Sequence, residues 1–62
     1  MLIKLRGKRV EHGYTQAQFA ELVGISLPSY RLKECGEIDF RMKEINKILE
    51  LLNCTYEEIF FQ

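Results

Sequence analysis

TQAQFAELVGISLPSYRLKECG, residues 15–36, is the stretch of this sequence that decides the fold, because two short helical patterns meet in it at Gly24. The Thr15 hydroxyl can accept from the backbone three residues on and Gln18 can reach back to it, which is the capping box that begins a helix. Ala20 allows two helices to approach closely at a corner, and Gly24 permits a tight reversal. The pattern predicts a helix-turn-helix whose second helix is held outward.

The second of these helical patterns has its own beginning and end. Ser26 can cap it, Pro28 falls within its first turn, where no hydrogen bond is lost, and Gly36 ends it. Ile25 and Tyr30 are spaced to fill the angle between the two helices. We expect at least three of the remaining side chains to look outward; they are Leu27, Pro28, Ser29, Arg31 and Leu32.

Apolar residues recur at three and four positions in the rest of the chain, which predicts helices and no convincing strand. A first helix is expected from about Leu2 to Glu11, with Leu5 and Val10 facing inward and Gly13 as its stop. A long helix follows the loop 37–41 and carries the most hydrophobic face, formed by Met42, Ile45, Ile48, Leu49 and Leu52. Thr55 and Glu58 predict a second capping box, before Ile59 and Phe60. The expectation is an all-α protein of five helices, with residues 1–62 as one domain.

The charges sum to zero but are unevenly placed along the chain. Residues 1–33 contain six Lys and Arg against two Glu, a balance of plus four, and residues 34–62 contain three against seven, a balance of minus four. This asymmetry suggests one face for a polyanion and another turned away from it. Two ordinary solvated helix surfaces would give the same pattern, so charge alone leaves both interpretations open.

Several function classes find no support in the sequence. No segment approaches the roughly 20 apolar residues of a membrane span. Residues 1–9, MLIKLRGKR, place charge inside the apolar pattern, unlike a secretory signal, so a cytoplasmic protein is expected. Cys35, Cys54 and His12 are too few and wrongly spaced for a metal site, and reduced thiols are expected. No spacing typical of nucleophilic or acid-base chemistry occurs, so we expect no enzyme, no cofactor and no small-molecule substrate.

Three segments together resemble the DNA-binding domains of lambdoid phage repressors and Cro proteins, the XRE type of helix-turn-helix. They are LRGKRVEHGYTQAQFAELVGIS at residues 5–26, KECG at 33–36 and LLNCTYEEIF at 51–60. The resemblance covers nearly the whole chain, and it is most similar to short regulators of phages and mobile elements in low-GC Gram-positive bacteria. It implies a five-helix lambda-repressor-like domain, a homodimer that binds double-stranded DNA sequence-specifically, and a third helix, about 27–34, in the major groove.

The resemblance also implies roles for individual residues. Thr15 and Gln16 match the start of the family's second helix, where a phosphate binds. The family's base-reading positions correspond to Leu27, Pro28, Ser29 and Leu32. Leu27 and Pro28 depart from the usual Gln, Arg or Asn and offer only apolar contact, for example with thymine methyl groups. Ser29 and Arg31 remain as donors. Lys33 is a possible phosphate ligand, whose stem is expected to lie on the core while the ammonium reaches water.

Further family positions predict structure. Arg9 and Glu34 match an arginine of the first helix and a glutamate ending the third, which predicts an ion pair. Arg41 stands where Ser commonly caps the fourth helix, leaving Asp39 or solvent to satisfy the helix amides. Candidates for a dimer contact are Leu22, Phe60 and Phe61. The rival hypothesis is a protein-interaction module that uses the apolar third helix instead of reading DNA.

Overall fold

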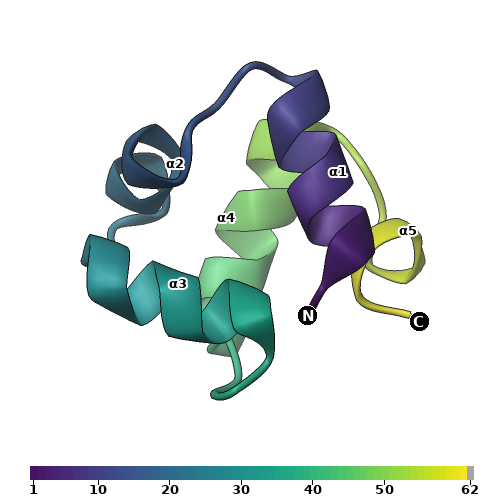
Figure 1. Ribbon diagram of the computed structural model, residues 1–62. Coiled ribbons are helices and arrows are strands. Elements are labelled where there is room, and N and C mark those ends of the chain that lie inside the picture. Colours follow the sequence, from purple (N-terminus) through teal and green to yellow (C-terminus); the bar gives the residue numbers. More distant parts are fainter. Residues whose placement is uncertain (62) are drawn as a thin grey trace.

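Five helices form the protein, and residues 1–61, which the computed structural model describes, contain no strand. They are α1 (Ile3–Glu11), α2 (Gln16–Val23), α3 (Leu27–Cys35), α4 (Met42–Leu52) and α5 (Tyr56–Phe60) (Figure 1). The all-α prediction is confirmed. None of these helices, over the same residues, has the length and apolar character needed to cross a membrane.

The two central helices begin and end where the sequence signals lie. Thr15 Oγ1 accepts from the Gln18 N–H at 3.1 Å and Gln18 Oε1 accepts from the Thr15 N–H at 3.0 Å, so the capping box of α2 is complete. Gly24, at φ 93°, ends α2 in the left-handed conformation that glycine adopts without strain. Ser26 Oγ accepts from the Ser29 N–H at 3.3 Å and starts α3. These local contacts fix the corner between α2 and α3.

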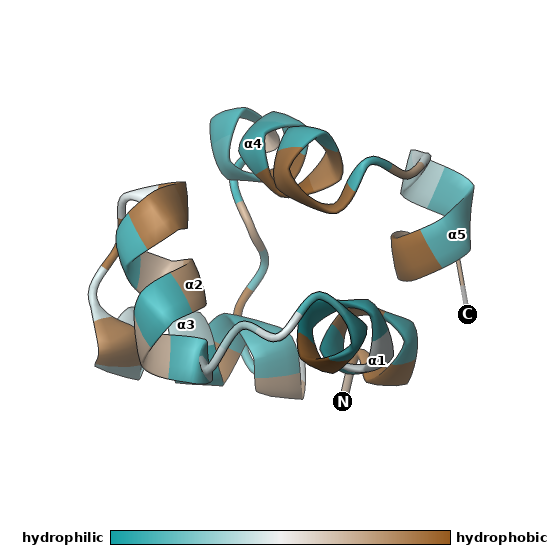
Figure 2. Cartoon of the chain, turned by 90° about the horizontal axis from the view of Figure 1, so that it is seen from above, coloured by the Kyte–Doolittle hydropathy of each residue, from teal (hydrophilic) through white to brown (hydrophobic). Residues whose placement is uncertain are grey.

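The helices enclose one apolar core. Viewed from above, α4 lies on the opposite side of the molecule from α1 and α3, with α2 and α5 at the two ends (Figure 2). Ala20 is only 1% exposed, which is consistent with a small residue at a close helix contact. A row of aromatic rings, with neighbouring centroids 5.7–5.9 Å apart, crosses the core from α2 to α5. The buried apolar residues are Leu5, Phe19, Ala20, Tyr30, Phe40, Ile48, Leu52 and Ile59.

Two residues expected on the inner faces of helices lie outside. Val10 is 58% exposed, because the inward face of α1 continues from Leu5 to Arg9, one turn on, and not to Val10. Met42 is 69% exposed, since it is the first residue of α4 and lies before the turn that reaches the core. The hydrophobic pattern therefore located both helices correctly but misplaced one residue on each.

The caps of α4 and α5 use side chains inside or just before each helix. The amide N–H of Arg41, which precedes α4, donates to Glu44 Oε1 at 3.0 Å, and the expectation that Asp39 or solvent satisfies the first amides of the helix itself stays a prediction. Thr55 Oγ1 accepts from the Glu58 N–H at 3.4 Å, which forms the Thr55 half of the second capping box. Both helices start at the residues that the sequence indicates.

Candidate nucleic-acid interface

A buried polar network joins α1, α2 and α3 and holds the third helix in place. Arg9 Nε lies 2.9 Å from Glu34 Oε2, and the two side chains are 8% and 3% exposed. The expected ion pair between the first and third helices is therefore present. Arg9 also donates to the Tyr14 carbonyl at 2.8 Å, which fastens the loop before α2 to the same network.

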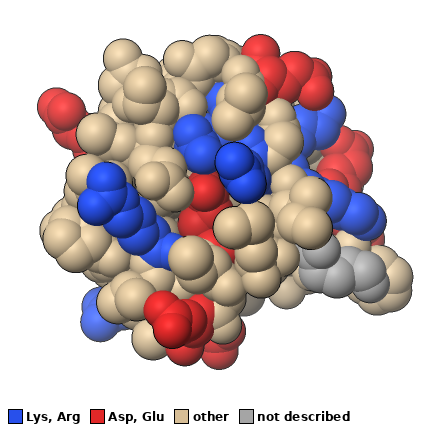
Figure 3. All heavy atoms as spheres, viewed as in Figure 1, with Lys and Arg blue, Asp and Glu red and all other residues tan. Residues whose placement is uncertain are grey.

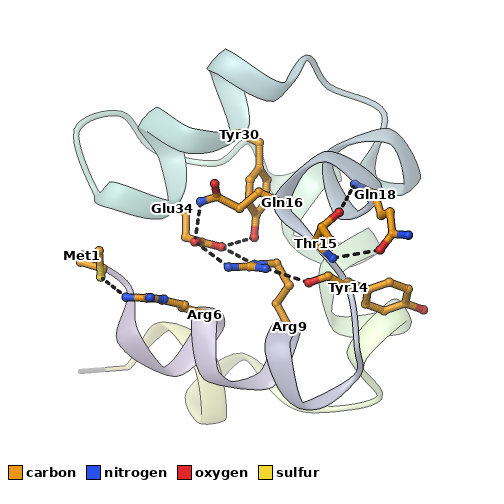
Figure 4. Close-up of polar contacts among 9 residues, drawn as sticks. All are labelled: Met1, Arg6, Arg9, Tyr14, Thr15, Gln16, Gln18, Tyr30 and Glu34. Atoms are coloured by element: carbon orange, nitrogen blue, oxygen red, sulfur yellow. Dashed lines mark hydrogen bonds and ion pairs between the residues drawn. The ribbon is translucent and has the colours of Figure 1, made fainter.

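Glu34 is the centre of this network (Figure 4). Its Oε1 accepts from Gln16 Nε2 at 3.0 Å and from Arg9 Nη2 at 3.3 Å, while its Oε2 accepts from the Tyr30 hydroxyl and from Arg9 Nε. Burial raises the pKa of the Glu34 carboxyl, but the hydrogen bonds from Arg9, Tyr30 and Gln16 outweigh it and hold that pKa below its ordinary value. Glu34 is thus an ionised group surrounded by donors.

Burial and the neighbouring Glu34 carboxylate raise the pKa of the Tyr30 hydroxyl, which therefore stays protonated as a donor. That hydroxyl lies inside the protein on a side chain with no exposed surface. The sequence contained a signal for the contact, since Tyr30 and Glu34 stand four residues apart on one helix.

Lys33 connects α3 to α4 instead of reaching water. Its Nζ lies 2.7 Å from Glu44 Oε1, and the two side chains are only 9% and 12% exposed. Burial raises the pKa of the Glu44 carboxyl, but the hydrogen bonds from Lys33 and the Arg41 amide outweigh burial and hold that pKa below its ordinary value. The expectation of a solvated ammonium is wrong, because the Glu44 carboxylate supplies a closer partner. This placement makes Lys33 a link between α3 and α4, and its role as a phosphate ligand stays a prediction.

One strip of α3 faces outward. Pro28, Arg31, Leu32 and Cys35 are all exposed, and they follow the i, i+3, i+4, i+7 spacing of a single helix face. Leu27 and Ser29 are half-buried at its margins. Of the five residues expected on the remaining faces, three therefore look fully outward. We call Pro28, Arg31, Leu32 and Cys35 the outer strip of α3.

Basic residues lie beside the α2–α3 turn at a position that the sequence did not single out. Exposed Arg41 and Lys43 line a surface hollow of about 410 Å³ together with Ser26, Ser29 and the paired side chains of Lys33 and Glu44. The hollow joins residues from the beginning of α3 and the beginning of α4. No local pattern could have predicted this grouping, because the chain brings the two helix starts together only when folded.

The surface charge is less asymmetric than the sequence suggests. The ion pairs Arg9–Glu34 and Lys33–Glu44 each join a base from residues 1–33 to an acid from residues 34–62. Removing both pairs from the sums changes plus four to plus two and minus four to minus two. In Figure 3, Lys and Arg side chains lie over α1 and α3 on the viewed face, and most acidic side chains lie toward its edges. The basic character of this face remains.

Thr15 and Gln16, the two residues expected to bind phosphate at the start of α2, have different partners in the structure. The Thr15 hydroxyl is engaged with the Gln18 amide, and the Gln16 side chain donates to Glu34 inside the network. The first backbone N–H groups of a helix have no partner within it, so the amides of Gln16 and Ala17 point out from this end. An anion here would meet backbone amides and the helix dipole, not the Gln16 side chain.

The three residues expected at a dimer contact do not form one surface. Phe61 is 69% exposed and Leu22 is 44% exposed, but α2 and the C-terminal end lie on opposite sides of the molecule (Figures 1 and 2). Phe60 is half-buried, with its ring 5.8 Å from that of Phe40 and 5.1 Å from that of Tyr56. Phe60 therefore contributes to packing, and of the three expected residues only Phe61 keeps a large exposed surface at the C-terminal end.

Within residues 1–61, no group of three or more His, Cys, Asp or Glu side chains could hold a metal ion. Cys35 is exposed and Cys54 is half-buried, and neither is in a disulfide. Burial and the charge of Glu58 raise the pKa of the Cys54 thiol, which opposes its ionisation.

Comparison with known proteins gives one match. The family model described as Helix-turn-helix matches residues 5–59, which include all of α2, α3 and α4 and most of α1 and α5. No curated protein and no solved structure matches the chain.

Proposed function

Because the chain belongs to this helix-turn-helix family of DNA-binding transcription regulators, of the XRE and Cro/repressor type, we propose that it binds double-stranded DNA sequence-specifically as a small regulator. The family is one of DNA-binding domains and not of enzymes. The third helix, about 27–34, would enter the major groove and block or redirect transcription by occupancy.

The observation that carries this proposal is the outer strip of α3 on a rigidly held helix. Glu34 at the inner face of α3 is fixed by donors from α1 and α2, and Lys33 ties the same helix to α4. A reading helix needs this fixation, because base contacts discriminate only when side chains meet the base edges in a defined register. The exposed Arg31 guanidinium can donate two parallel hydrogen bonds to guanine.

Phosphate contacts would flank α3 on both sides. The amides at the start of α2 suit one phosphate, and Arg41 with Lys43 suits another beside the α2–α3 turn. The half-buried Ser29 lines the same hollow and can donate its hydroxyl to a phosphate or a base edge. Thr15 supports the first site by fixing the helix start.

A homodimer fits the size of the molecule. Its longest extent, measured on Cα atoms, is 24 Å, whereas half-sites on one face of DNA lie about 34 Å apart. One copy can therefore cover one half-site, and two copies are needed for a palindrome. Exposed Phe61 and Tyr56 at the C-terminal end are the apolar groups available for pairing. The resemblance to short phage and mobile-element regulators supports a cytoplasmic protein of this kind.

Binding to a labelled operator, measured by fluorescence anisotropy across a salt series, tests the proposal. Replacing Arg31 by Ala should weaken binding by about 1–3 kcal/mol, roughly 5- to 150-fold, because a major-groove contact is lost. Lys47→Ala is the matched control, since this exposed base lies on α4 and pairs only with Glu50, at 3.8 Å, among the described residues. Affinity should also fall with salt, with a slope of about −0.9 per phosphate contact.

The rival function, a protein-interaction module, is favoured by one observation, the exposure of Pro28 and Leu32 on the outer strip. Such a module would not respond to Arg31→Ala when mixed with DNA and would show no salt-dependent DNA binding. An anisotropy series in which both effects are missing would favour this rival and contradict DNA recognition.

A further inference from the structure

The outer strip of α3 presents mainly apolar groups where a base-reading helix ordinarily presents hydrogen-bond donors and acceptors. We propose, on the basis of the proposed DNA-binding function, that Pro28 and Leu32 recognise the C5-methyl groups of thymines in the major groove. The DNA bound by this protein would then carry thymines at the base pairs that face these side chains.

The polar side chains of α3, all of which the structure describes, leave few alternatives for reading bases. Tyr30 donates to Glu34, Glu34 is buried among its donors, and Lys33 is paired with Glu44. The polar groups left outside are the Arg31 guanidinium, the half-buried Ser29 hydroxyl and the weakly polar Cys35 thiol. Arg31 and these small groups offer few hydrogen bonds with which to specify several base pairs, so we expect the apolar members of the strip to contribute to discrimination.

Thymine offers the complementary chemistry. Its C5-methyl is the apolar group that distinguishes it on the major-groove edge of a base pair. Leu32 is 43% exposed and Pro28 is exposed, so both have apolar surface to bury against a methyl. Contact between them removes apolar surface from water on both partners.

The spacing of the two side chains limits where the thymines lie. Pro28 and Leu32 are four residues apart, about 6 Å along the helix at 1.5 Å per residue. Base pairs are stacked about 3.4 Å apart. If the axis of α3 follows the groove, the two recognised thymines lie about two base-pair steps apart, with Arg31 reaching the bases beside them.

Deoxyuridine scanning tests this inference. An operator is first selected from random duplex DNA, and each thymine is then replaced singly by deoxyuridine, which removes the methyl and leaves the hydrogen-bonding edge intact. We expect about fourfold weaker binding at the contacted positions, which corresponds to about 0.8 kcal/mol for one buried methyl. At other thymines the affinity should not change.

Two variants show which side chain contacts which thymine methyl. In Leu32→Ala, the deoxyuridine penalty at one position should disappear, and in Pro28→Ala the penalty at the other should disappear. Ile38→Ala is the matched control, because Ile38 is 44% exposed against 43% for Leu32 but lies in the loop between α3 and α4. Circular dichroism establishes that each variant is folded.

The inference is overturned if no thymine in the selected operator is sensitive to deoxyuridine, or if the penalties persist unchanged in both α3 variants. Either result leaves sequence-specific DNA binding intact, since the operator was bound. Failure to select any operator would instead overturn the proposed function and this inference together.

Discussion

Replacing Glu34 by Gln removes the charge and one of the two acceptor oxygens on which the network between α1, α2 and α3 depends. The two Glu34 oxygens accept from Arg9, Gln16 and Tyr30, with two hydrogen bonds to each oxygen. Gln has nearly the same shape but replaces one oxygen by an NH₂ group, so two donors would face a donor. Arg9, which is only 6% exposed, would also lose its counter-charge.

The expected loss is large for a protein of this size. Removing one member of a buried ion pair costs about 3 to 5 kcal/mol, because the other charge stays buried without a partner. A chain of 62 residues has a free energy of unfolding of about 3 to 9 kcal/mol at 0.05–0.15 kcal/mol per residue. We therefore expect Glu34→Gln to be marginally folded or unfolded at 25 °C.

Urea denaturation followed by circular dichroism at pH 7 measures this loss. A variant that replaces the three buried members, Arg9→Met with Tyr30→Phe and Glu34→Leu, should be more stable than Glu34→Gln, since no buried charge is left unpaired. The exposed pair of Lys47 and Glu50 is the control. Replacing either of its members by Ala should change stability by less than about 1 kcal/mol.

The reasoning would be refuted if Glu34→Gln lost less than about 1 kcal/mol, as a surface pair does. It would equally fail if the apolar triple variant were less stable than Glu34→Gln, since the penalty could then not come from an unpaired buried charge.

Other predictions concern pH, backbone and assembly. The pKa of the Glu34 carboxyl lies below its ordinary 4.5, so its contribution to stability is present above pH 4.5 and is lost as the pH falls through the lowered pKa. The urea midpoint should therefore fall from pH 5 to pH 3. It should fall less steeply in Glu34→Gln, if that variant is folded enough to measure. Gly24→Ala should destabilise the protein by about 1 to 2 kcal/mol because φ at Gly24 is 93°. Gly7→Ala, inside α1 with open space around it, should stabilise the protein by about 0.5 to 1 kcal/mol. Thermal melts should show a lower melting temperature for Gly24→Ala and a higher one for Gly7→Ala, and shifts in the same direction would contradict the backbone argument. Phe61→Ser should weaken self-association in sedimentation equilibrium and Leu22→Ser should not; equal effects would remove the C-terminal end as the pairing surface.

The frame of the fold could be predicted because its signals are local. The capping box of Thr15 and Gln18 and the left-handed Gly24 each act over three residues or fewer, and they fix where α2 and α3 begin and end. The outward face of α3 followed from the same boundaries, since a helix of known start has a known rotation. The resemblance added the pair Arg9 and Glu34, which no local pattern contains.

The features of the site that the sequence did not predict depend on contacts between distant parts of the chain. The hydrogen bond of Gln16 to Glu34 spans 18 residues and that of Lys33 to Glu44 spans 11, so each polar side chain found an internal partner that periodicity cannot reveal. The misplacement of Val10 has the same origin. A pattern based on hydrophobicity chooses Val10 over Arg9, whereas the folded protein buries Arg9 because Glu34 compensates its charge.

Selection of binding sites from random duplex DNA at moderate salt tests the central claim most directly. If α3 reads the major groove from a dimer, the selection should yield a palindromic motif with half-sites about 34 Å apart, and Arg31→Ala should fail to enrich it. Failure of the unaltered protein to enrich any sequence, while it remains folded by circular dichroism, would contradict sequence-specific DNA recognition.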